Sequence, residues 1–294
     1  MRNLKLNKKI IFFSLILFYT ALIRWWKIGH VPQLINQGEF QQRIIFSTFS
    51  LLTIYLIYIY AKNLLSPKTA LISAWVFSIM PWVQEQGRLN SIHNLTLFMF
   101  LISLIINNKY KNILPRSASW IIFIFFYYLV NSNSWLFHPL NYTLKISQYL
   151  NNIFYLISPY FLFFHNTSFW WGGIKEFGVM YISYIPFFLI GILGLIYTKK
   201  NLSVFYWMII LTLIGALNPQ FPEGREIFLL VPFLILMIST GVMKLINIKG
   251  LIPRIFLSFM LFFMIYELSQ FFHYYYVHYP QDISNNISNI NVPF

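Results

Sequence analysis

The chain of 294 residues contains no cysteine and few charged residues. The lack of cysteine excludes disulfide bonds, iron–sulfur clusters and cysteine-based zinc sites. Charged residues make up 10% of the chain, hydrophobic residues make up 58%, and the mean hydropathy is +0.64. This composition excludes an ordinary soluble protein. No glycine-rich phosphate loop follows a strand-like segment, so P-loop and dinucleotide-binding proteins are not indicated either.

Long apolar runs separated by short polar breaks are typical of a multi-span membrane protein. We therefore expect an all-α helical bundle over residues 1–272, with an extracytoplasmic tail at 273–294. About nine transmembrane helices are expected near residues 10–27, 44–61, 68–83, 93–108, 117–131, 178–197, 203–217, 227–246 and 252–272.

The distribution of charge predicts the topology. Four basic residues precede the first apolar run, so the N-terminus is expected inside the cell. Alternation from there places two-thirds of the Lys and Arg on the cytoplasmic side. It places the histidines and all seven acids at or near the outer face; these acids are Glu39, Glu85, Glu176, Glu223, Glu226, Glu267 and Asp282. We expect a multi-pass protein of the plasma (inner) membrane, with outer loops at about 28–43, 84–92, 132–177 and 218–226.

The segment 147–165 is apolar enough to suggest a tenth span, but Asn151, Asn152 and Pro159 interrupt it. If it crossed the membrane, the basic loops that follow would face outward, against the positive-inside rule. We therefore expect an interfacial or re-entrant segment on the outer face. The net charge of +14 suits anionic inner-leaflet lipid, and no nucleic-acid partner is expected.

Glu39 follows the first apolar run, in an outer loop that also contains His30. Partial burial at the mouth of a helix bundle raises the pKa of a carboxyl group, which would then serve as a general base near neutral pH. The alternative is a glutamate on a hydrated surface loop.

Two further outer turns carry arginine. Arg88 follows Glu85, and its planar guanidinium matches phosphate oxygens in a bidentate way. Arg225 follows Glu223 at the start of an apolar run, where the helix dipole and a cation act together on an anion. The alternatives are an interfacial Arg88 paired with Glu85 and a turn in which acids neutralise Arg225.

The six histidines lack the spacing of metal ligands on one helix. No metal ligand is therefore assigned and no cofactor is firmly implied, although a divalent metal is left open.

Several short motifs occur in an order that resembles the GT-C class of polytopic glycosyltransferases, especially bacterial relatives of protein mannosyltransferases and aminoarabinose transferases. The stretch from Ile28 to Glu39 resembles the first-loop segment of that class. Met80-Pro81-Trp82 with Arg88 resembles its Ser-Pro-Trp and Ser-Arg turn. Further matching motifs are Pro67 to Leu71, Ser158 to Phe163 with Gly178, Pro186 and Gly191, Pro222 to Arg225 with Pro232 and Gly241, and Tyr276 to Pro280.

The resemblance implies transfer of a sugar from a polyprenyl-phosphate donor to an acceptor on the extracytoplasmic face. It implies Glu39 as the base and Arg88 and Arg225 as phosphate ligands. We also expect Glu85, Glu223 and His30 to take part in substrate binding. The Asp-Glu pair of the class is Gly38-Glu39 here. The chain also looks short for this class. A truncated or catalytically impaired relative, or a non-enzymatic binder or transporter of lipid-linked sugar, is therefore the alternative.

Overall fold

The computed structural model describes residues 8–28, 37–88, 93–110, 113–130, 145–165, 174, 176–198, 202–217 and 226–281. Within these ranges the chain is almost entirely helical and contains no strand, which confirms the all-α prediction. In chain order the elements are α1 (Lys8–Trp25), α2 (Gln37–Leu64), α3 (Pro67–Ile79), α4 (Pro81–Gln86), α5 (His93–Lys109), α6 (Ile113–Val130), α7 (Ile146–Ile157), η3 (Tyr160–Phe164), η4 (Ile182–Tyr184), α8 (Ile185–Thr198), α9 (Ser203–Gly215), η5 (Glu226–Leu230), α10 (Val231–Asn247), α11 (Leu251–His273) and η6 (Tyr274–His278).

Each of the nine expected apolar segments lies largely on helix in the described part of the chain. Three helical stretches there are long and apolar enough to cross a membrane, namely Phe40–Leu64, Phe228–Asn247 and Leu251–Gln281. In contrast, α3 and α9 have 13 residues each. Such helices are only about 20 Å long, at 1.5 Å per residue, whereas the hydrocarbon core is about 30 Å thick. The count of nine spans and the proposed topology therefore stay predictions.

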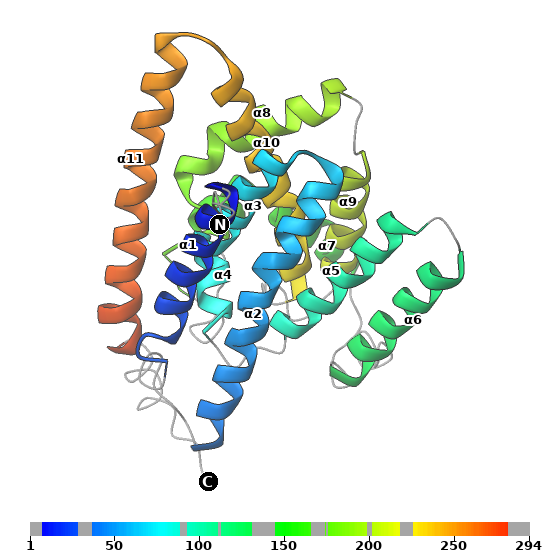
Figure 1. Ribbon diagram of the computed structural model, residues 1–294. Coiled ribbons are helices and arrows are strands. Elements are labelled where there is room, and N and C mark those ends of the chain that lie inside the picture. Colours follow the sequence, from blue (N-terminus) through cyan, green and yellow to red (C-terminus); the bar gives the residue numbers. More distant parts are fainter. Residues whose placement is uncertain are drawn as a thin grey trace, which may run out of the picture.

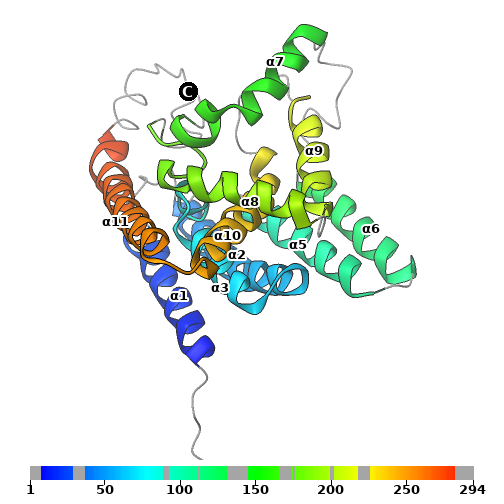
Figure 2. The ribbon, with the colours of Figure 1, turned by 90° about the horizontal axis from the view of Figure 1, so that it is seen from above.

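Helix α10 lies at the centre of the bundle. It packs most extensively against α8 and α3, and it also touches α9 and α11. On the other side of α3, α2 packs against both α3 and α5, and α6 covers α5. Figures 1 and 2 show α1 beside α11 at one edge of the molecule and α6 at the opposite edge. The core is therefore built around α3 and α10, whose side chains are mostly buried.

Glycine permits a close crossing between α8 and α10. A Cβ atom added at Gly191 would overlap the carbonyl oxygen of Met237, and one at Gly241 would overlap that of Phe187. Gly194 likewise lies against the Lys244 side chain. Small residues let helix backbones approach closely where lipid removes most of the hydrophobic drive for association. The two helices thus meet backbone to backbone.

Proline divides the expected segment 68–83 into two helices. Ser66 caps α3, its Oγ accepting a hydrogen bond from the Thr69 amide, and α3 ends at Ile79. Met80 is extended at ψ 133°, and Pro81 begins α4, as expected for a residue that restricts its predecessor and lacks an N–H. All six residues of α4 are buried. The expected outer loop 84–92 therefore begins inside the protein, as part of a short helix.

Helix α7 has an exposed apolar face. Ile146, Leu150, Phe154 and Ile157 are exposed along one stripe, while the amide of Asn152 on the buried side donates to the Ala216 carbonyl at 2.9 Å. With 12 residues, α7 is too short to span a bilayer, and the chain bends at Ser158 before η3. These features support the interfacial interpretation of 147–165.

Glu267 is the acid that comes nearest to the middle of an expected span, and it has a structural partner. From α11 its carboxylate accepts hydrogen bonds from the amides of Ile182 at 2.8 Å and Ser183 at 2.9 Å. These amides belong to the first turn that leads into α8, where N–H groups lack intrahelical acceptors. Glu267 therefore caps α8 from a neighbouring helix.

The glycine crossing gives a first prediction. Replacement of Gly191 or Gly241 by leucine should lower the free energy of unfolding by about 1–3 kcal/mol or more, because the side chain must displace backbone of the partner helix. Thermal unfolding in detergent measures this effect. Leu193→Ala on the same helix is the control, since Leu193 is 67% exposed and its loss should change stability little. Equal unfolding temperatures for all variants would contradict the packing argument.

Candidate functional site

The carboxyl end of α1 is held by two buried arginines. Nη1 of Arg88 donates to the carbonyls of Ile23 and Arg24, and its Nη2 donates to that of Trp26 at 2.6 Å. Nη1 of Arg43, on α2, donates to the Ile28 carbonyl at 3.3 Å. The last carbonyls of a helix have no intrahelical donor and form the negative end of its dipole. Arg88 and Arg43 therefore satisfy this end with charged donors.

Two tyrosines from the other end of the chain enclose Arg88. Its Nη1 also donates to the Tyr276 hydroxyl at 3.0 Å. The guanidinium carbon lies 5.3 Å from the ring centre of Tyr275 and 5.2 Å from that of Tyr276, within the range of cation–π attraction. Arg88 is 1% exposed. It is thus a buried link between α1, the end of α4 and η6.

Arg24 lies next to this link and is completely buried at 0% exposure. Its Nε, Nη1 and Nη2 have no hydrogen-bond partner among the described residues. The guanidinium packs against Gly87, where an added Cβ would overlap Nη1 and lie 2.8 Å from Cζ. The sequence interpretation missed Arg24. A basic residue at the carboxyl end of the first apolar run was the available signal, but its burial against α4 is a tertiary feature.

Glu85 is a buried acid at the same end of α4, with an exposure of 1%. Its Oε1 accepts a hydrogen bond from the Ile174 amide at 3.2 Å. Both Glu85 and Arg88 interact electrostatically with Tyr275. The structure therefore brings together two of the expected substrate-binding residues, Glu85 and Arg88, and adds Arg24.

The remaining expected site residues are only partly placed. Glu39 lies in the first turn of α2, and its side chain is not among those described. His30, Glu223 and Arg225 lie outside the described residues. Convergence of Glu39 and Arg225 with Arg88 therefore stays a prediction. Among the described residues, no group of three His, Cys, Asp or Glu is arranged to hold a metal ion.

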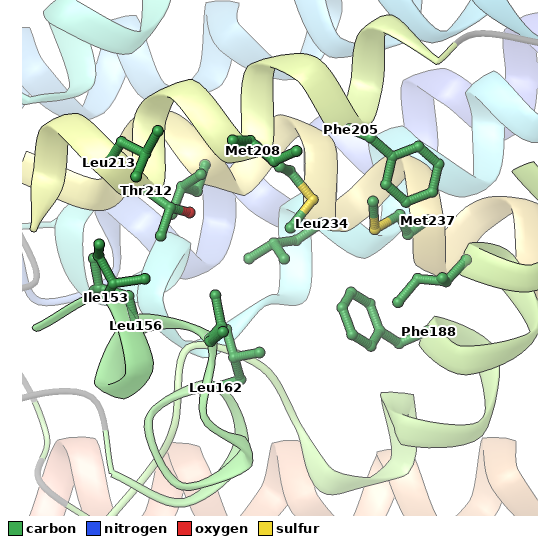
Figure 3. A pocket seen from close by; sticks show the side chains of 14 residues that line it. Ile153, Leu156, Leu162, Phe188, Phe205, Met208, Thr212, Leu213, Leu234 and Met237 are labelled. Carbon is green, nitrogen blue, oxygen red and sulfur yellow. The ribbon is translucent and has the colours of Figure 1, made fainter. Parts of the chain in front are cut away.

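A separate apolar cavity of about 420 Å³ lies between α7, α8, α9 and α10. Figure 3 shows Met208, Leu234 and Met237 pointing into it, with Thr212 as the polar residue of its lining. Ile157 and Ile209 line the cavity and also have exposed side chains. The cavity therefore reaches the surface between α7 and α9.

Comparison with known families identifies one match. Residues 20–127 are similar to the family described as dolichyl-phosphate-mannose-protein mannosyltransferase. The match covers just over a third of the chain and runs from α1 into α6. No curated protein and no solved structure matches the chain. The match supports a glycosyltransferase of the GT-C type and a membrane protein, and it contains Arg24, Glu39, Glu85 and Arg88.

The contacts of Arg88 give a second prediction. Arg88→Met should lower the free energy of unfolding by about 3 kcal/mol, because it leaves buried carbonyls at the end of α1 without donors. Arg88→Lys should cost less but not be neutral, since one ammonium group cannot reproduce the planar fork. Chemical or thermal unfolding in detergent measures both. Arg254→Gln is the control, because Arg254 is exposed; wild-type stability of Arg88→Met would refute the proposed link.

Proposed function

We propose that the protein is a membrane glycosyltransferase that moves a sugar from a polyprenyl-phosphate donor to an acceptor on the extracytoplasmic face. The observation that carries this proposal is the match of residues 20–127 to the mannosyltransferase family. The buried cationic group at the end of α1 lies within this match and supplies the charge that such a reaction needs. Because the family description contains dolichyl-phosphate mannose, a mannosyl donor is the first to test.

Two chemical steps require protein groups. An acceptor hydroxyl must lose its proton as it attacks the sugar, and a carboxylate near the first loop is suited to take it. The lipid phosphate must leave with its negative charge stabilised by fixed cations. We assign the first role to Glu39, at the start of α2, and the second to arginines, among which Arg225 remains a candidate. Glu223 and His30 remain candidates for substrate binding.

The contacts of Arg88 refine its proposed role. Its Nη1 and Nη2 atoms donate to carbonyls of α1 and to the Tyr276 hydroxyl. In this proposal Arg88 fixes the end of α1 and contributes positive charge to the site, while Glu85 lies beside it on α4. The apolar cavity between α7 and α10 has the size and lining of a ligand pocket, which suits part of an isoprenoid chain.

The assignment of the base gives a third prediction. In proteoliposomes supplied with polyprenyl-phosphate mannose and a membrane extract as acceptor source, Glu39→Gln should reduce sugar transfer at least about 100-fold. Donor binding should change little, because glutamine retains the shape of the side chain. Glu176→Gln is the matched control, since Glu176 is an exposed acid expected on the same face. Undiminished transfer by Glu39→Gln would remove this residue from the mechanism.

The same assay separates the enzyme from the alternative of a non-catalytic relative. An enzyme releases polyprenyl phosphate as sugar appears on the acceptor. A binder or a transporter of lipid-linked sugar retains saturable donor binding in wild type without any loss of donor. Intact donor after incubation with every sugar tested would favour that alternative.

The expected topology gives a fourth prediction, for which the absence of cysteine is an advantage. Single cysteines at Asn63, in the last turn of α2, and Ser147, in α7, replace exposed residues. In intact cells an impermeant maleimide should label Ser147→Cys, whereas Asn63→Cys should be labelled only after the membrane is opened. The reverse pattern would place the proposed site on the cytoplasmic face.

A further inference from the structure

Arg24 is the one buried guanidinium in the described part of the chain whose three nitrogens all lack a hydrogen-bond partner. A buried cation without partners is strongly unfavourable in a protein interior. Within membrane proteins such residues are rare and mark functional sites. The contacts of Arg24 within the described structure therefore do not explain its burial, whereas a functional role would.

Arg24 lies close to a second buried cation. Arg24 and Arg88 are each no more than 1% exposed, and the positive charge of Arg88 acts on Arg24. Two guanidinium groups in one buried region repel each other. A negatively charged group bound beside Arg24 would relieve this repulsion, and a phosphate group carries such a charge.

The geometry also favours phosphate over a point-like anion. A guanidinium is a planar fork that donates to two oxygens of one phosphate. Arg88 uses its own fork on the end of α1, whereas Arg24 makes no such bonds. Gly87 provides the space that the Arg24 guanidinium occupies, because any side chain there would collide with it. Arg24 is thus positioned beside Arg88 with its donors unused.

We propose that Arg24 binds a phosphate group, with Arg88 as the second positive charge of the site. The proposal rests on the proposed function for its preferred source, the phosphate of a polyprenyl-linked donor or product. The chemistry itself is that of a phosphate ester or free phosphate. Since all three nitrogens are enclosed, a ligand reaches them only with a local shift of the packing around α4.

Binding is tested without turnover, so the site and the proposed reaction can fail separately. Purified full-length protein in detergent is titrated with a polyprenyl phosphate, with the uncharged polyprenol of the same length and with inorganic phosphate, and the unfolding temperature is measured. Polyprenyl phosphate at roughly 100 times its dissociation constant should raise the unfolding temperature by about 4 °C or more. Polyprenol should not. Stabilisation by inorganic phosphate as well would indicate that the phosphate alone is recognised, and stabilisation by the lipid alone would identify a lipid-linked source.

The variants isolate Arg24. Arg24→Met should unfold at the wild-type temperature or above it without ligand, because an uncompensated buried charge is replaced by an apolar side chain. It should bind polyprenyl phosphate at least about 10-fold more weakly. Arg24→Lys should retain part of the binding, and the exposed control Arg254→Gln all of it. Full stabilisation of Arg24→Met by polyprenyl phosphate, equal stabilisation of wild type by polyprenol, or a ligand-free Arg24→Met that unfolds well below wild type would overturn the proposal.

Discussion

The hydrogen bonds from Arg88 to the carbonyls at the end of α1 are the interaction on which the candidate site depends. They join residues more than 60 positions apart, and the bond to Tyr276 adds a segment from the far end of the chain. The last carbonyls of α1 have no intrahelical donor. A guanidinium with several donors satisfies them at once. The positions of Arg24, Glu85 and η6 follow from this link.

The site is therefore built from both halves of the chain, although similarity to the mannosyltransferase family covers only residues 20–127. Tyr275 and Tyr276 lie outside that range and reach Arg88 because α11 runs beside α1 (Figures 1 and 2). The direction of α11 is fixed in turn by Glu267, which binds the first turn before α8. Helix α8 is locked on α10 by the glycine crossing. Backbone contacts of this kind position side chains with little freedom.

The sequence was sufficient to predict the helices, because apolar runs between polar breaks have few other structures available in lipid. The break at Pro159 and the short apolar α7 were also predictable. The number of spans was not, since hydropathy does not separate a helix buried among other helices from one that faces lipid. Arg88 was expected in a turn and lies in one after α4, but its burial depends on α1, Tyr275 and Tyr276, which are distant in sequence. The burial of Arg24 depends on Gly87, which is distant in sequence.

The neighbouring residues Arg24 and Arg88 have different proposed roles, ligand binding for Arg24 and structural support for Arg88. The motif around Pro81 and Trp82 draws attention to Arg88, yet the protein itself uses the donors of Arg88 on α1. Because its Nη1 and Nη2 atoms already donate within the fold, Arg88 contributes charge to a ligand but few new hydrogen bonds. Arg24 has the opposite balance, because it destabilises the ligand-free fold and retains its donors. The unused donors of Arg24 can form new hydrogen bonds with a bound anion. Arg24 is therefore the better candidate for contact with substrate, and Arg88 is the better candidate for a structural role in the site.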